Sequence, residues 1–136
     1  MEWQRDGYTL SDDPSRIDLD TTCRLLAGCY WAADRPRETI ERSIHNSICC
    51  GLYRGAEQIG FARLVTDRAT FAWVCDVVVD PDHRSAGLGK WLVECVISHP
   101  QVAGMLQLLK TRDAHGLYER FGFGREECMT RRAARS

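Results

Sequence analysis

The central segment of the chain reads Asp76-Val77-Val78-Val79-Asp80-Pro81-Asp82-His83-Arg84-Ser85-Ala86-Gly87-Leu88-Gly89-Lys90. Its three valines are apolar on both faces, which is typical of a central strand covered by helices. A sharp polar turn follows, and two glycines then precede a helical pattern formed by Trp91, Leu92, Cys95 and Val96. The segment therefore predicts a buried strand that leads through a turn directly into a helix.

The predicted helix start has the features of a phosphate-binding site. The first amide groups of a helix have no intrahelical acceptor, and the peptide dipoles place about half a positive charge at this end. Gly87 and Gly89 lack the Cβ atoms that would keep a diphosphate away from the main chain, while Arg84 and Lys90 supply positive charge. The pattern predicts a nucleotide-containing ligand, although glycines here also fit a role in ending the strand or in close packing.

Two common nucleotide-binding motifs are excluded by their spacing. A dinucleotide site requires G-x-G-x-x-G, and a Walker loop requires G-x-x-x-x-G-K-[ST]. Neither is present, and Lys90 is followed by Trp91 rather than by a hydroxyl residue that could bind magnesium. The segment instead contains Arg-x-x-Gly-x-Gly, from Arg84 to Gly89.

This motif resembles the phosphate loop of the GNAT superfamily of acetyl-CoA-dependent N-acyltransferases. In that family the loop follows a central strand and wraps the coenzyme A pyrophosphate with backbone amides. A second segment, Thr111 to Phe123, is similar to the family's later motif, in which a short helix carries a tyrosine and ends in Gly-Phe. The two motifs stand in the family's order and at its usual separation.

The resemblance implies an α/β (α+β) fold, with a mixed, mostly antiparallel central sheet flanked by helices. Two parallel strands in the middle of this sheet, here about 73–79 and 104–110, would splay apart and admit the pantetheine arm of acetyl-CoA. Main-chain groups of the first strand would hold the arm like an added strand, and backbone donors near the split would polarise the thioester. The cofactor-binding residues implied in this way are Val77, Val78, Val79, Arg84, Ser85, Ala86, Gly87, Leu88, Gly89, Lys90, Asp113 and Tyr118.

The resemblance also implies two proton transfers. Tyr118 takes the place of the tyrosine that is usually proposed to protonate the departing thiolate, although it also fits a packed aromatic residue. Many family members carry a Glu-Asp pair before the apolar triplet, where this chain has Cys75-Asp76, so the usual base cannot be carried over. Three alternatives are open: Asp76 itself, which equally suits capping of nearby amides, a helix carboxylate such as Glu38 or Glu41, or a chain of water molecules.

Composition sets bounds on the class of protein. The 136 residues with 44% hydrophobic content predict a single domain over residues 1–136. A net charge of −1 without a long basic run argues against nucleic-acid binding. The one basic cluster lies in the segment 131–136, which we expect to be a flexible tail. No apolar run of about 20 residues and no apolar signal core is found, which predicts a cytoplasmic protein with no membrane partner.

The seven cysteines predict no disulfide framework, because their number is odd and no signal segment precedes them. No metal is expected, since the chain lacks a C-x-x-C pair and its four histidines are scattered. Several residues at apolar periodic positions are expected in the core: Cys23, Cys29, Cys75, Cys95, Trp31, Trp73 and Trp91.

The remaining patterns predict alternating helices and strands. Ile40, Ile44 and Ile48 repeat every four residues and mark a helix that starts near Pro36. Asp20 or Thr21 would cap the helix before it, and Asp113 is a natural N-cap for the short helix of the later motif. The predicted strands are 7–10 at one sheet edge, 48–53, 58–65, 70–79, 104–110 and 123–130, and the predicted helices are about 20–30, 36–47, 89–100 and 115–120.

These observations and the resemblance together predict an N-acetyltransferase that moves an acetyl group from acetyl-CoA to a primary amine of a small molecule by direct attack. The resemblance places acceptor recognition on the first two helices and nearby loops, about 20–47, with Trp73 as a further candidate for the acceptor pocket. Two alternatives are open: a protein N-terminal or lysine acetyltransferase, and a non-catalytic coenzyme A-binding sensor or interaction module, which the missing glutamate motivates. A homodimer is implied by the resemblance alone.

Overall fold

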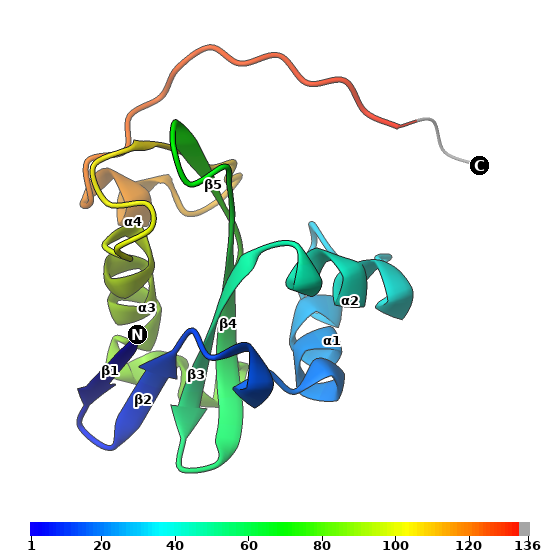
Figure 1. Cartoon of the computed structure of the whole chain (residues 1–136), viewed down its shortest axis with the longest axis vertical. Helices are drawn as coiled ribbons and strands as arrows, with labels where there is room; N and C mark the ends of the chain where they lie inside the picture. Colours follow the sequence, from blue (N-terminus) through cyan, green and yellow to red (C-terminus); the bar gives the residue numbers. More distant parts are fainter. Residues whose placement is uncertain (134–136) are drawn as a thin grey trace.

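The computed structural model describes residues 1–133, which form one curved sheet with helices on both faces (Figure 1). The strands, in their spatial order, are β1 (Glu2–Arg5), β2 (Tyr8–Ser11), β3 (Ile48–Arg54), β4 (Glu57–Thr66), β5 (Phe71–Val79) and β6 (Leu106–Leu108). The α-helices are α1 (Leu19–Ala27), α2 (Arg37–His45), α3 (Leu88–Ile97) and α4 (His115–Glu119). Two short 3-10 helices, η1 (Pro14–Arg16) and η2 (Pro81–Ala86), precede α1 and α3.

The sheet separates two apolar clusters. On one face α3 packs Leu92 and Val96 against strand residues such as Leu52 and Leu64. On the other face α1 and α2 pack against Phe61 and neighbouring side chains. Figure 1 shows the two helix layers on opposite sides of the sheet, with α3 and α4 together on one of them. Burial on both faces explains why the β5 valines form a continuous apolar run rather than an alternating one.

The two parallel strands are β5 and β6, and all other neighbouring strands are antiparallel. This confirms the expected mixed sheet. Pairing between β5 and β6 begins at Phe71 with Leu106 and ends at Trp73 with Leu108, although β5 continues to Val79. The second half of β5 therefore has a strand partner only on the β4 side within the described residues, which is the arrangement expected of diverging strands.

A β-bulge interrupts β5 at the start of this unpaired half. Asp76 and Val77 stand together opposite the single residue Ala62 of β4. Asp76 has a φ of 55°, in the left-handed region that residues other than glycine rarely adopt. A bulge bends its strand and changes the direction of the side chain it carries. It turns the Asp76 carboxylate toward the segment that joins α1 to α2.

The expected first strand was wrong in its extent and its place. Residues 7–10 do not form the sheet edge, because β1 pairs with β2 as a hairpin and covers it. Asp6 and Gly7 form the turn, and both have a positive φ. β1 gave no signal in the sequence because its side chains are mostly exposed and do not alternate. The cap of α1 also differs: Asp18, rather than Asp20 or Thr21, accepts from the Thr21 N–H.

The strand expected over 123–130 is not present. Phe123 packs against the core, but from Gly124 to Ala133 the chain is exposed and runs away from the body of the molecule (Figure 1). Within 124–132 only Cys128 and Met129 are apolar, so the segment has no apolar face to bury. As a result β6 is an edge strand of the described sheet, and the parallel pair β5–β6 lies at this edge rather than in the middle of the sheet as expected. The expected tail begins inside this exposed stretch, and its last three residues lie outside the described part of the chain.

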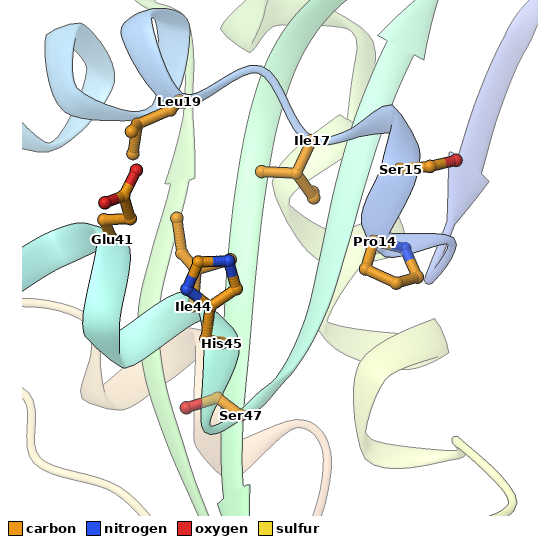
Figure 2. Close-up of a pocket in the computed structure, with 8 residues that line it drawn as sticks. All are labelled: Pro14, Ser15, Ile17, Leu19, Glu41, Ile44, His45 and Ser47. Atoms are coloured by element: carbon orange, nitrogen blue, oxygen red, sulfur yellow. The ribbon is translucent and has the colours of Figure 1, made fainter.

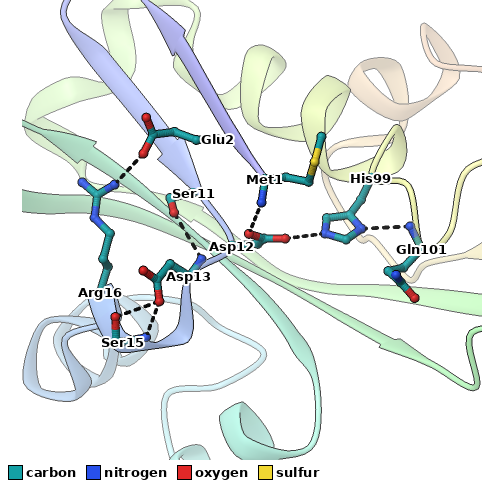
Figure 3. A network of polar contacts seen from close by, with 9 residues as sticks. All are labelled: Met1, Glu2, Ser11, Asp12, Asp13, Ser15, Arg16, His99 and Gln101. Carbon is teal, nitrogen blue, oxygen red and sulfur yellow. Dashed lines mark hydrogen bonds and ion pairs between the residues drawn. The ribbon is translucent and has the colours of Figure 1, made fainter.

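A polar network fastens the start of the chain to the end of α3 (Figure 3). His99 is buried, and its Nδ1 accepts a hydrogen bond from the Gln101 N–H. Its Nε2 therefore carries the proton and donates to Asp12 at 2.7 Å. Asp13 caps η1 nearby, and Ser11 accepts from the Asp13 N–H. These bonds satisfy polar groups that burial would otherwise make costly.

The cysteines are all free thiols. Cys29 and Cys95 are buried as expected, whereas Cys23 and Cys75 are only half-buried. Burial raises the pKa of the Cys49 and Cys50 thiols to about 12, which makes them poor nucleophiles. None of the helices in the described range combines the length and the apolar character needed to cross a bilayer.

Candidate active site

The segment between β5 and α3 forms a tight connection that presents the start of α3. Asp80 caps η2 by accepting from the Asp82 N–H at 3.0 Å, and Arg24 of α1 lies 3.4 Å from the same carboxylate. The hydrogen bond from Asp82 is the main reason why the pKa of Asp80 lies below its usual value, and Arg24 adds to it. The polar turn expected from the sequence is thus a 3-10 helix fixed at its first residue.

The N-terminus of α3 is open to an incoming anion. Gly87 is the N-cap residue, with a φ of 69° that glycine adopts without strain. No side chain of the described residues caps this helix, and the first intrahelical bond is donated by the Trp91 N–H to the Gly87 carbonyl. The amides of Leu88, Gly89 and Lys90 precede that bond, so they have no intrahelical acceptor. The Leu88 side chain is buried and anchors the turn.

Both glycines of the motif face open space. A Cβ atom added at Gly87 or at Gly89 would meet no atom of the described chain within 4 Å. Packing inside the protein therefore does not explain why Gly89, whose φ is ordinary, lacks a side chain. The open space leaves room for the close approach of a ligand to the main chain. This contrasts with Gly60, where an added Cβ would lie 3.0 Å from the Val78 carbonyl oxygen.

The charged residues of the motif lie at the surface on either side of this opening. The Arg84 Nε donates to the Val79 carbonyl at 3.0 Å, so this side chain folds back onto the end of β5. The Lys90 side chain is exposed. Ser85 and Ala86 follow Arg84 and form the end of η2. Of the three β5 valines, Val78 and Val79 are buried and Val77 is half-buried, beside the unpaired side of the strand.

Tyr118 lies on α4 and is half-buried. Its ring packs edge-to-face on Phe123, with centroids 5.9 Å apart. Burial raises the pKa of the Tyr118 hydroxyl, and the nearby Tyr30 and Asp113 add to this rise. Within residues 1–133 the hydroxyl has no hydrogen-bond partner. It is therefore a protonated donor at neutral pH.

Asp76 is held by three donors. Its Oδ2 accepts from Arg35 Nη1 and from Arg63 Nε, each at 2.8 Å, and its Oδ1 accepts from Trp31 Nε1 at 3.1 Å. The Asp76 side chain is 1% exposed. Burial alone would raise its pKa, but the hydrogen bond and charge of Arg63, followed by those of Arg35, outweigh burial and hold the pKa below its usual value. A carboxylate in this state is a poor proton acceptor.

The segment between α1 and α2 contributes residues that sequence reasoning missed. Trp31, expected in the core, is 42% exposed and reaches Asp76 with its indole N–H. The Tyr30 hydroxyl accepts from the Arg112 N–H at 3.1 Å, and the Arg112 guanidinium lies 3.7 Å from the Tyr30 ring centroid. Two loops, one after α1 and one after β6, are thereby joined. In the sequence, the one signal for this contact between loops is the pair of large aromatic residues Tyr30-Trp31 next to a segment of mixed charge.

The remaining candidate residues lie farther from this arrangement. Asp113 is exposed and does not cap α4, because the Thr111 hydroxyl accepts from the Ala114 N–H instead. Glu38 is exposed on α2, 4.0 Å from Arg42. Glu41 borders a hollow of about 540 Å³ between η1 and α2 (Figure 2). None of the predicted cofactor residues lines that hollow.

Comparison with known proteins agrees with this geometry. Residues 45–125, more than half of the chain, match the family model of the acetyltransferase (GNAT) domain. A candidate acetyltransferase of Gibberella zeae is 30% identical over 114 residues, which cover 69% of this chain and 64% of the relative. An uncharacterised N-acetyltransferase of Pyropia yezoensis is 29% identical over 126 residues, 88% of this chain and 71% of the relative.

Solved structures show the same fold. A crystal structure of a candidate acetyltransferase of the GNAT family from Xanthomonas campestris has a TM-score of 0.89 and 37% identity, and the match covers 96% of each chain. The chain spans less than two thirds of the length of the Gibberella zeae relative. The family model, the relatives and the fold agree, and this chain belongs to the GNAT family of acetyltransferases.

Proposed function

We propose that the protein transfers an acetyl group from acetyl-CoA to the primary amine of a small molecule. The observation that carries the proposal is the position of the open α3 N-terminus directly after the unpaired half of β5. Amides of Leu88 to Lys90 would bind the pyrophosphate, with Arg84 and Lys90 beside it. Backbone groups of Val77 to Val79 would bind the pantetheine arm in the place where β6 has left the sheet.

Two features of this chain fit a bound acetyl-CoA. No atom of the described chain blocks a ligand from the main chain at Gly87 and Gly89. The N-terminus of α3 also offers amides that no side chain of the described residues caps. When bound, the coenzyme supplies an activated acetyl thioester. The protein's part is to place the acceptor nitrogen within reach of the thioester carbon and to stabilise the developing oxyanion.

Tyr118 is proposed as the acid of the reaction. The amine nitrogen forms a bond to the carbonyl carbon, the carbon–sulfur bond breaks, and the thiolate takes the hydroxyl proton, which solvent then restores to Tyr118. The raised pKa keeps Tyr118 protonated before the transfer. For the amine proton, we propose a route through water. Asp76 is committed to three donors, Glu38 is exposed beside Arg42, and Glu41 borders the hollow between η1 and α2 (Figure 2).

A small acceptor is favoured by the bridge between Tyr30 and Arg112. The Arg112 N–H and guanidinium both contact Tyr30, so the loop after α1 and the loop after β6 are tied across the acceptor side. A tie of this kind limits the space for a polypeptide. The proposed partners are thus acetyl-CoA and an amine. A cytoplasmic location and a homodimer stay predictions.

The test combines coenzyme binding with turnover. Calorimetric titration should give an acetyl-CoA affinity in the micromolar range, and a thiol-release assay over a panel of small amines should show release that depends on the amine. Release only with peptides that carry a free N-terminus or lysine would favour a protein acetyltransferase. Tight acetyl-CoA binding without release for any amine or peptide would favour the sensor. Absence of acetyl-CoA binding would refute the proposal outright.

A further inference from the structure

The charges beside the proposed transfer point do not balance. The four side chains Asp76, Arg35, Arg63 and Trp31 form what we call the Asp76 cluster. It contains one carboxylate and two guanidinium groups. The side chains of Arg35 and Arg63 are 23% and 14% exposed, so both cations are largely removed from water. The cluster therefore holds one positive charge in excess. A largely buried charge without a counterion costs free energy.

The two arginines differ in how many of their donors are used. Arg63 donates through Nε to Asp76 and through Nη1 to the Ser47 hydroxyl at 3.1 Å, and both bonds fix its side chain. The Arg35 guanidinium donates one N–H to Asp76 and makes no other hydrogen bond to the described chain, whereas its backbone N–H donates to the Ala32 carbonyl. A guanidinium has five N–H donors in a planar fork. Arg35 therefore keeps most of its hydrogen-bonding capacity for a partner that the protein does not supply.

Nearby acidic side chains do not neutralise this excess. Asp34 and Asp113 are exposed, and neither forms an ion pair with Arg35 or Arg63 among residues 1–133. Arg112, which lies over the Tyr30 ring, adds a further exposed cation on the same side. The surroundings of Arg35 thus favour a bound anion rather than a cation.

The position of Arg35 connects this charge to the proposed reaction. Its partner Asp76 stands in the bulge of β5, immediately before the valines proposed to carry the pantetheine arm. Trp31 fixes the same loop to the same carboxylate. Arg35 belongs to the loop between α1 and α2, so an acceptor that approached the thioester from the side of this loop would pass its guanidinium.

We propose that the acceptor amine carries an anionic group, a carboxylate or a phosphate, and that Arg35 binds this group. The inference rests on the proposed acetyl transfer and narrows its substrate class. A guanidinium matches the planar geometry of a carboxylate or the oxygens of a phosphate in a two-point contact. The contact supplies the missing counterion of the Asp76 cluster and sets the distance between the anion and the attacking nitrogen.

The experiment compares amines that differ only in the anionic group. Phenylalanine is paired with phenethylamine to test a carboxylate, and glucosamine 6-phosphate is paired with glucosamine to test a phosphate. Thiol release should give a kcat/KM at least about tenfold higher for the anionic member of one pair or the other, as expected for a charge-assisted two-point contact. The pair that shows the preference identifies the anion.

Variants then assign the preference to Arg35. In Arg35→Gln the ratio of kcat/KM between anionic and neutral members should fall by about tenfold or more, through KM, and Arg35→Lys should fall between this variant and the wild type. Arg37→Gln is the matched control, because Arg37 is an exposed neighbour that pairs with Asp20 instead. It should keep the wild-type ratio. Thermal unfolding of each variant confirms that it is folded.

Three outcomes would overturn the inference. The first is a wild-type kcat/KM that is no higher for the anionic amine than for the neutral amine in either pair, which leaves acetyl transfer itself intact. The second is an equal loss of kcat/KM for the anionic and the neutral amine in Arg35→Gln, which would mean that Arg35 has only a structural role. The third is the absence of thiol release with every amine although acetyl-CoA binds, which would remove the proposed function as well. Calorimetric binding of the anionic amine to the coenzyme A complex gives a readout independent of turnover.

Discussion

At the scale of single residues, Asp76 shows what a local pattern can and cannot reveal. The sequence placed a carboxylate at the end of an apolar strand, where a base or a cap was expected. Its partners stand 13, 41 and 45 residues away, and nothing local links them to it. The bulge that turns the side chain toward them is also set by pairing with β4. The structure thus shows Asp76 as the anchor of the loop between α1 and α2 rather than as a free base.

Replacing Asp76 with Asn tests this role through stability. The change leaves two largely buried guanidiniums without their counterion, so the free energy of unfolding at pH 7 should fall by about 2–4 kcal/mol. Because the folded-state pKa of Asp76 is lowered, its contribution is complete above the unfolded value near 3.8 and is lost as the pH falls through the folded value. Urea unfolding at several pH values should show a constant difference above pH 5.

The matched control is Asp34→Asn on the same loop. Asp34 is exposed, and its replacement should change the free energy of unfolding by less than about 0.5 kcal/mol. An Asp76→Asn protein as stable as the wild type at pH 7 would contradict the anchoring role. A wild-type pH–rate profile in the folded variant would agree with a base elsewhere.

Tyr118→Phe tests the proposed acid. Removal of the hydroxyl should lower kcat by about 100-fold, within the usual range for a general acid, and leave the acetyl-CoA affinity within about twofold. Since burial raises the pKa of Tyr118 above its ordinary 10.0, the wild-type kcat should show no loss of this acid below pH 10. Stopped-flow thiol release measures both quantities.

A tyrosine at another site controls for the chemistry of the substitution. Tyr8 lies on β2, where its hydroxyl contacts Arg54, and Tyr8→Phe should keep the wild-type kcat. If Tyr118→Phe turned over as fast as the wild type, Tyr118 would be a packing residue and the thiolate would leave without an acid.

At the scale of elements, the strand, turn and helix around residues 76–90 could be predicted because each has a local cause. Three consecutive apolar residues, a proline-containing polar turn and a glycine at a left-handed position act within a few residues of one another. The segment 123–130 had no such support: its prediction as a strand relied on the expected order of elements. Residues 124–133 are exposed, so the expected order of elements does not produce a strand where the sequence has no apolar face to bury.

Gly89→Val tests the phosphate loop as an element. No atom of the described chain obstructs a side chain at this position, so the melting temperature should change little. A branched side chain would instead occupy the space needed by the diphosphate, and acetyl-CoA affinity should fall by about tenfold or more. Gly87→Val should lose both stability and affinity, because its φ is positive. Calorimetry and thermal melts separate the two effects.

Gly124→Val is the control, since Gly124 also has open space around it and an ordinary φ, but lies in the exposed C-terminal segment. It should bind acetyl-CoA as tightly as the wild type. Undiminished affinity in Gly89→Val would mean that the diphosphate does not lie on this loop.

At the scale of the whole molecule, two apolar clusters share one sheet, so both should melt together. Leu26 of α1 and Leu92 of α3 are fully buried on opposite faces, and each Leu→Ala change should cost about 2–5 kcal/mol. Because β4 and β5 contribute to both clusters, each variant should shift the same single transition in tryptophan fluorescence and in far-UV circular dichroism. Two separate transitions would contradict a single domain.

Leu106→Ala controls for the loss of a leucine as such, because Leu106 is 61% exposed on β6. The midpoint of the unfolding transition of Leu106→Ala should stay close to that of the wild type.

The left-handed backbone at position 76 also restricts which mutations this lineage can explore. Asparagine, aspartate and glycine tolerate that conformation, whereas longer or branched side chains meet steric strain there. A glutamate at this position is one methylene longer and lacks the short side chain that lets aspartate and asparagine hydrogen-bond locally in this conformation, so it would be strained. The backbone that directs the Asp76 carboxylate toward Arg35 and Arg63 thus also limits which side chain can stand there.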